Sequence, residues 1–110
     1  MSEYFILEGK EIVSATVQEW STMFSNRNGR TVAKTQIDGF MVSTVFLGLD
    51  HAFDEGPPML FETMVFSNRG GDYQERCSTY EQAEEMHERI CDEVRAGLAI
   101  NYLNEAAKDI

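Results

Sequence analysis

The sequence predicts an α+β fold: a single antiparallel β-sheet of about five or six strands, a long C-terminal helix packed on it, and a short helix near residues 17–26. Three observations support this. Runs rich in β-branched and aromatic residues alternate with tight-turn signals over the first two thirds of the chain. The segment after residue 79 instead repeats apolar residues at helical spacing. A length of 110 residues with 43% hydrophobic residues suits one core, in a single domain at 1–97 followed by a helical tail at 98–110.

The first elements are a hairpin and a short helix. YFILEG and KEIVSAT have the composition of two short strands, with Gly9 in the turn between them. Thr16 and Glu19 have the spacing of a capping box, in which each side chain bonds the other residue's backbone N–H. The helix that starts there is predicted to end near Asn28–Gly29, a strong stop signal.

The middle of the chain has the composition of strands. TVAKTQI leads to Asp38–Gly39, which is typical of a two-residue hairpin turn. FMVSTVFLGL carries apolar residues on both faces and is therefore predicted to be a central strand. The polar connection DHAFDEGPP leads to another strand, PMLFETMVF, and the turn at residues 68–71 leads to a short last strand, DYQERC.

The main helix is predicted to begin at a second capping box, Ser78 to Glu81. At 100° per residue, one arc of this helix is apolar, and it consists of Tyr80, Ala83, Met86, His87, Ile90, Cys91, Val94 and Leu98. A neighbouring arc is acidic and consists of Glu81, Glu84, Glu85, Glu88 and Asp92. This acidic arc is either a solvated face or a docking stripe for a basic surface.

The tail after Gly97 carries a second apolar stripe, rotated from the first, with Tyr102, Leu103 and Ile110 among its members. One straight helix cannot bury both stripes against the same sheet. The helix therefore breaks at Gly97 or the tail packs elsewhere. Two outcomes stay open: the tail folds back on its own domain, or it packs on a second copy of the chain to form a homo-oligomer.

Charge and composition limit the classes of function. The net charge is −10, and residues 72–110 hold ten acids against four bases. Direct nucleic-acid binding is not expected, because it needs a clustered basic footprint. The acidity fits either solubility alone or a basic protein partner. No apolar run is long enough to span a membrane, and the N-terminus lacks a signal-peptide pattern, so a cytoplasmic protein is expected. Two cysteines without zinc-site spacing indicate thiols in a reducing compartment.

One polar cluster could carry chemistry: Asp50, His51, Asp54 and Glu62, to which His87 of the helix may be added if the sheet brings it near. These residue types can hold a divalent ion or act as acid and base. Their spacing matches no motif of known mechanism, and a stiff acidic loop explains most of them. We therefore predict no catalytic residue, no metal site and no cofactor.

Glu62 and His87 each have a structural alternative. Glu62 shares a strand face with apolar residues, so a partner such as Arg76, Lys34 or a hydroxyl of Ser43 or Thr44 is expected if the carboxylate is buried. A core histidine with one hydrogen bond is the default for His87. A buried polar pair between Glu62 and His87 is a further hypothesis.

The segment VSTVFLGLDHAFDEGPPMLFETMVF, followed by YQERCSTYEQAEEMHERI, resembles a family of small uncharacterised phage and prophage proteins. The resemblance spans about Val42 to Val94 and implies an origin in a phage or mobile element and a role in the host cytoplasm. No activity is attached to that family.

Three functions follow as hypotheses. The leading one is a small, acidic, non-enzymatic accessory or inhibitor protein that binds a host or phage macromolecule. The second is a small-ligand or divalent-metal-binding protein that uses the Asp50, His51, Asp54 and Glu62 region. The third is a virion or assembly component that oligomerises through its tail.

Overall fold

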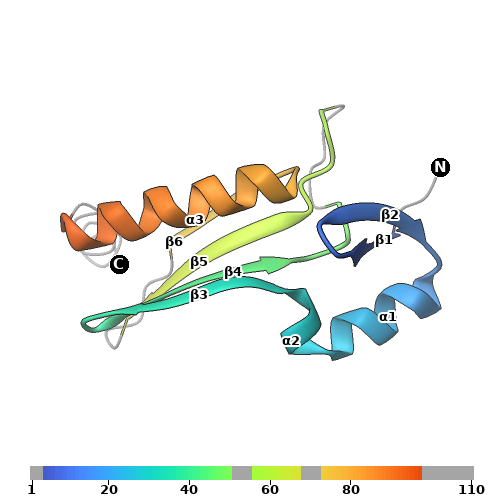
Figure 1. Ribbon diagram of the computed structural model, residues 1–110, viewed down its shortest axis with the longest axis horizontal. Helices are drawn as coiled ribbons and strands as arrows, with labels where there is room; N and C mark the ends of the chain where they lie inside the picture. Colours follow the sequence, from blue (N-terminus) through green and yellow to red (C-terminus); the bar gives the residue numbers. More distant parts are fainter. Residues whose placement is uncertain (1–3, 51–55, 68–72, 98–110) are drawn as a thin grey trace, which may run out of the picture.

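The computed structural model describes residues 4–50, 56–67 and 73–97. Within these ranges the chain forms six strands and three helices (Figure 1). In chain order these are β1 (Tyr4–Glu8), β2 (Glu11–Ala15), α1 (Val17–Ser25), α2 (Arg27–Arg30), β3 (Thr31–Ile37), β4 (Phe40–Phe46), β5 (Phe61–Ser67), β6 (Tyr73–Cys77) and α3 (Tyr80–Arg95). The predicted α+β class is confirmed. None of the described helices combines the length and apolarity needed to cross a membrane.

The strands form two sheets, so the prediction of a single sheet of five or six strands is wrong. Strands β3, β4, β5 and β6 form a four-stranded antiparallel sheet in sequence order, whereas β1 and β2 pair only with each other. The reason lies at Gly48, whose φ of 68° takes the chain out of strand conformation soon after β4 ends at Phe46. The hairpin meets this irregular continuation through one isolated bridge, Tyr4 to Leu49, instead of adding to the sheet edge.

Helix α3 lies across one face of the four-stranded sheet (Figure 1). Alternation in β4 sends Val42, Thr44 and Phe46 to that face, and all three are fully buried. The core side chains of α3 come from the predicted apolar arc: Ala83, Met86, His87, Ile90, Cys91 and Val94 are buried. Leu98, the last predicted member of that arc, lies outside the described residues. Burying these side chains is the main force that holds the helix on the sheet.

The first capping box is confirmed, and the helix that it opens lies close to the predicted residues 17–26, although it ends before the predicted stop signal. The backbone N–H of Glu19 donates to Thr16 Oγ1, and the N–H of Thr16 donates to Glu19 Oε1. Helix α1 ends at Ser25 rather than near Asn28–Gly29. Asn26 ends α1 and also caps α2, since its side chain accepts a hydrogen bond from the N–H of Gly29. The asparagine thus divides one predicted helix into two.

Helix α3 begins one residue later than predicted. Thr79, not Ser78, is its N-cap, and the box is completed by Gln82 instead of Glu81. The amide oxygen of Gln82 accepts from the backbone N–H groups of both Ser78 and Thr79, which fixes this register. The helix ends at Arg95, before Gly97, whose φ is 81°. This helix end fits the first of the two open alternatives, a break at Gly97, since a glycine in this conformation is typical of a helix end.

A junction around Gly48 joins the hairpin and α1 to the sheet. The N–H of Phe5 donates to the carbonyl of Gly48, and the indole N–H of Trp20 donates to the carbonyl of Leu47 at 2.9 Å. A Cβ atom at Gly48 would lie 2.4 Å from the carbonyl oxygen of Phe5 and 2.8 Å from the Trp20 ring. Only glycine fits this conformation and this space.

Candidate functional site

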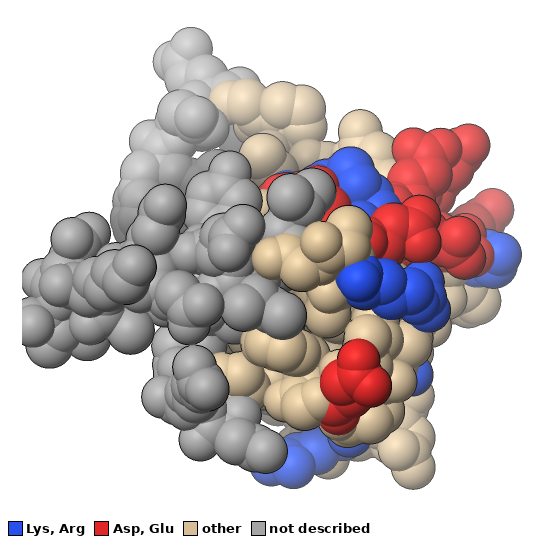
Figure 2. Space-filling model, turned by 90° about the vertical axis from the view of Figure 1, so that its left-hand side faces the viewer, with Lys and Arg blue, Asp and Glu red and all other residues tan. Residues whose placement is uncertain are grey.

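All five predicted acidic residues of α3 are exposed on the outer side of the helix. Two of them have a base nearby: Lys10 lies 3.4 Å from Glu84, and Arg95 lies 3.1 Å from Asp92. Both ion pairs are well exposed, so each contributes little to the stability of the fold. Glu81, Glu85 and Glu88 form no ion pair with any described residue. Figure 2 shows acidic side chains gathered on one side of the molecule, with a few basic groups among them.

The exposed side of α3 also borders a shallow hollow of about 780 Å³. Seven residues line it: Glu81, Glu84, Glu85, Glu88, Arg89, Asp92 and Glu93. The successive acids repel one another, because like charges three or four residues apart on a helix are neighbours. Only Glu81, in the first turn, gains from the helix dipole. The surface therefore holds negative charge that is not compensated within the described chain.

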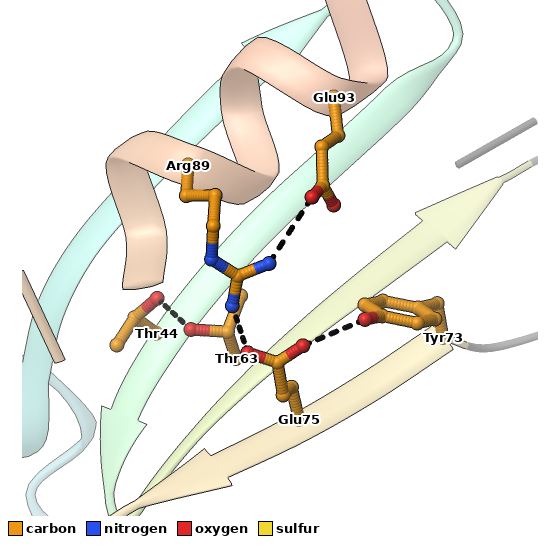
Figure 3. Close-up of polar contacts among 6 residues, drawn as sticks. All are labelled: Thr44, Thr63, Tyr73, Glu75, Arg89 and Glu93. Carbon is orange, nitrogen blue, oxygen red and sulfur yellow. Dashed lines mark hydrogen bonds and ion pairs between the residues drawn. The ribbon is translucent and has the colours of Figure 1, made fainter. Parts of the chain in front are cut away.

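Arg89 does not neutralise this surface, because other carboxylates hold it (Figure 3). Its guanidinium donates to Glu75 on β6 and to Glu93 one turn further along α3. Tyr73 donates its hydroxyl to the same Glu75 at 2.7 Å. This hydrogen bond, with partial burial, raises the pKa of Tyr73 to about 12. The network ties the edge strand to the helix and leaves the outer acids without a cation.

His87 is a core histidine with two hydrogen bonds, one more than predicted. Its Nε2 lies 2.9 Å from Thr35 Oγ1, and its Nδ1 lies 2.7 Å from Thr44 Oγ1. Thr44 in turn bonds the hydroxyl of Thr63 (Figure 3). Burial lowers the pKa of His87, although the charge of Glu88 acts in the opposite direction. The ring is thus a neutral link between α3 and three strands, with no open position for a ligand.

Glu62 is buried, and one of its predicted partners, Arg76, is confirmed. The residue is 8% exposed, and Arg76 donates its Nε–H to the carboxylate at 2.8 Å. The two residues face each other across the β5–β6 ladder. Glu62 does not pair with His87, so that hypothesis is wrong. The reason is alternation: Thr63 faces α3, and Glu62 next to it therefore points to the opposite face of the sheet.

Only part of the predicted polar cluster lies within the described residues. Asp50 Oδ1 accepts the backbone N–H of Met59 at 3.1 Å and so joins the two ends of the connection between β4 and β5. His51 and Asp54 lie outside the described residues. Among residues 4–50, 56–67 and 73–97, no group of three or more His, Cys, Asp or Glu side chains could hold a metal ion. Within the described chain, Asp50 and Glu62 are each held by a hydrogen bond, to Met59 and to Arg76.

The remaining predicted positions add no chemistry within the described chain. Tyr102, Leu103 and Ile110 of the tail lie outside the described residues. Cys77 and Cys91 are free thiols, as predicted. Burial raises the pKa of the Cys77 thiol to about 11. That thiol is protonated at neutral pH and is a weak nucleophile.

A basic groove on the other face of the sheet was not predicted. Arg27, Arg30 and Lys34 line it, together with residues of β4 and β5. One sequence signal could have pointed to it: these three bases fall within eight residues, with no acid among them, in a chain of net charge −10. These three residues meet at one groove because the chain turns at α2, and the sequence does not predict that turn.

Comparison of the chain with protein-family models, with curated proteins and with solved structures found no match. The chemistry of the two surfaces is therefore the ground for assigning a function.

Proposed function

We propose that this protein is a small, non-enzymatic accessory or inhibitor protein that binds a macromolecular partner with a basic surface. One observation carries the proposal: Glu81, Glu85 and Glu88 are exposed along α3 with no ion pair to any described residue. A basic partner would relieve the repulsion among these carboxylates and would approach faster in their field. As part of the same proposal, the partner belongs to a host cell, in line with the resemblance to phage and prophage proteins suggested by the sequence.

The partner's side of this interface would be rich in Lys and Arg and would meet a rigid surface. Helix α3 is held by a buried arc of six residues and by the Arg89 bridge to β6. The acids are thus presented without ordering of the backbone on binding, which lowers the entropic cost of association. Such binding weakens as salt is added, because exposed charges are screened over about 8 Å at physiological ionic strength.

The test compares two charge reversals of equal size. Glu85→Lys with Glu88→Lys changes the proposed surface, and Glu8→Lys with Glu11→Lys changes two exposed acids on the β1–β2 hairpin. Tagged wild-type protein is used to capture partners from host lysate, and the captured protein is then titrated against each variant. The α3 variant should lose most binding, and the hairpin variant should retain it. Equal binding by both variants, with unchanged melting curves, would remove α3 as the docking surface.

The two other functions stay predictions. A ligand or divalent-metal site in the Asp50, His51, Asp54 and Glu62 region would show as saturable stabilisation in a thermal-shift screen. An assembly role through Tyr102, Leu103 and Ile110 would show in light scattering as an oligomer that a chain truncated after Arg95 no longer forms.

A further inference from the structure

The face of the sheet opposite α3 carries a groove. This groove belongs neither to the acidic surface of α3 nor to the core. Its volume is about 670 Å³, within the range of small-molecule sites. Eight described residues line it: Arg27, Asn28, Arg30, Thr31, Lys34, Ser43, Val45 and Phe66. Lys34 and Ser43 face each other in the β3–β4 ladder, and Thr31 faces Val45. The groove thus lies over β3, β4 and β5, and three residues of α2 also line it.

The distribution of basic side chains singles this groove out. The described residues include seven Lys and Arg. Lys10, Arg76, Arg89 and Arg95 each form an ion pair with an acid. The other three, Arg27, Arg30 and Lys34, form none with a described residue, and all three line the groove. In a protein of net charge −10, a cavity that gathers the three unpaired bases and no described acid favours an anionic occupant.

Arg30 is held in place without using its hydrogen-bonding capacity. Its guanidinium carbon lies 4.0 Å from the centre of the Phe24 ring, a cation–π contact. Its Nε atom is buried and has no hydrogen-bond partner among the residues that the structure describes. A buried donor without a partner costs free energy, so a ligand oxygen that reached it would be bound the more strongly. The stacked ring fixes the plane in which the guanidinium can receive a phosphate or carboxylate.

The rest of the lining is apolar or weakly polar. Phe66 on β5 is 41% exposed, although it lies on a sheet face beside half-buried neighbours. Val45 adds a second apolar surface, and Ser43 and Thr31 offer hydroxyl groups. An exposed aromatic ring next to a cluster of bases is the combination with which proteins stack a nucleobase and hold its phosphate. The lining therefore suits a ligand with one flat ring and one anionic group.

We propose that this groove binds a mononucleotide. Its phosphate lies among Arg27, Arg30 and Lys34, and its base packs against Phe66. A mononucleotide is favoured over a nucleic-acid strand for two reasons. The groove has the volume of a single small ligand, and three basic side chains cannot offset the repulsion between a polyanion and a chain of net charge −10. This site is separate from α3 and does not rest on the partner proposed above.

Calorimetric titration of the full chain tests the proposal. The probes are adenosine, guanosine, cytidine and uridine monophosphates, each nucleoside without phosphate, inorganic phosphate, and a short single-stranded oligonucleotide. At least one monophosphate should bind saturably, and its nucleoside and inorganic phosphate should each bind at least about tenfold more weakly, because each lacks one half of the contacts.

Matched variants place the site. Lys34→Ala should weaken binding of the monophosphate about tenfold, whereas Lys10→Ala, which removes another exposed lysine from the α3 side, should leave binding unchanged. Phe66→Leu keeps an apolar side chain but removes the flat ring, and it should also weaken binding. Three results would each overturn the proposal: no monophosphate binds; Lys34→Ala and Lys10→Ala bind alike; or the oligonucleotide binds more tightly than every monophosphate.

Discussion

Replacing Gly48 by alanine should loosen the attachment of the hairpin and α1 to the sheet. Two costs are involved. A φ of 68° with a side chain costs about 1–2 kcal/mol in the left-handed region. The added Cβ would also lie 2.4 Å from the carbonyl oxygen of Phe5, a backbone atom that cannot move aside without the strand. Overpacking of this kind costs about 1–3 kcal/mol. The free energy of unfolding should therefore fall by about 2–5 kcal/mol.

Gly9 provides a matched control. Its φ of 64° is close to that of Gly48, but apart from its chain neighbours, a Cβ there would meet no atom of a described residue within 4 Å. Gly9→Ala should thus cost only the backbone strain, about 1–2 kcal/mol. The difference between the two variants isolates the contact with Phe5.

Urea unfolding monitored by two signals measures this difference. Trp20 is the only tryptophan, and its indole N–H donates to Leu47 beside Gly48, so its fluorescence reports on the junction. Far-ultraviolet circular dichroism reports on the whole fold. In Gly48→Ala the fluorescence transition should move to lower urea than in Gly9→Ala. Equal midpoints for the two variants would refute the steric reasoning.

Three further predictions concern buried polar groups. Thr44→Val should lower the free energy of unfolding by about 1–3 kcal/mol in urea titrations, because His87 Nδ1 loses its partner; Thr44→Ser should restore most of this. Burial lowers the pKa of His87 in the folded protein, so the unfolded chain binds more protons near pH 6. Stability should therefore fall as pH drops below about 6.5. An equal dependence of stability on pH in His87→Gln would exclude the histidine as the cause. Arg76→Ala should destabilise by about 1–3 kcal/mol, because Glu62 would stay buried without a partner, and the added change Glu62→Gln should recover part of that loss in thermal melts.

Local signals in the sequence predicted the elements well. The Asp38–Gly39 turn joins β3 to β4 with Ile37 opposite Phe40, as its composition indicates. The capping box at Thr16 and the buried arc of α3 also follow from spacing alone, since they depend on residues three or four apart. The N-terminus of α3 was misplaced by one residue because two overlapping capping boxes fit the sequence, and only the amide of Gln82 decides between them.

Long-range arrangement was not predictable in the same way. Nothing in the composition of YFILE distinguishes a fifth strand of the sheet from a separate hairpin, and the answer depends on the backbone at Gly48. Burial of Glu62 was left open by the sequence, but its partner Arg76 was among the candidates, and the two residues lie on neighbouring strands. The basic groove escaped prediction because it is assembled from α2 and three strands, and spacing along the chain does not report which side chains meet across a sheet.

The alternation of side chains along β4 separates the charges of the molecule onto two opposite sides of the sheet. Thr44 points toward the helix that carries the acids, and its neighbours Ser43 and Val45 point toward the groove that carries the unpaired bases. Opposite charges are thus held on the two sides of a rigid frame made of the sheet and α3, which makes the domain a permanent dipole. In the electric field of a charged partner, the domain would rotate before contact. The sheet between the two surfaces also lets both be occupied at once, with neither occupant blocking the other.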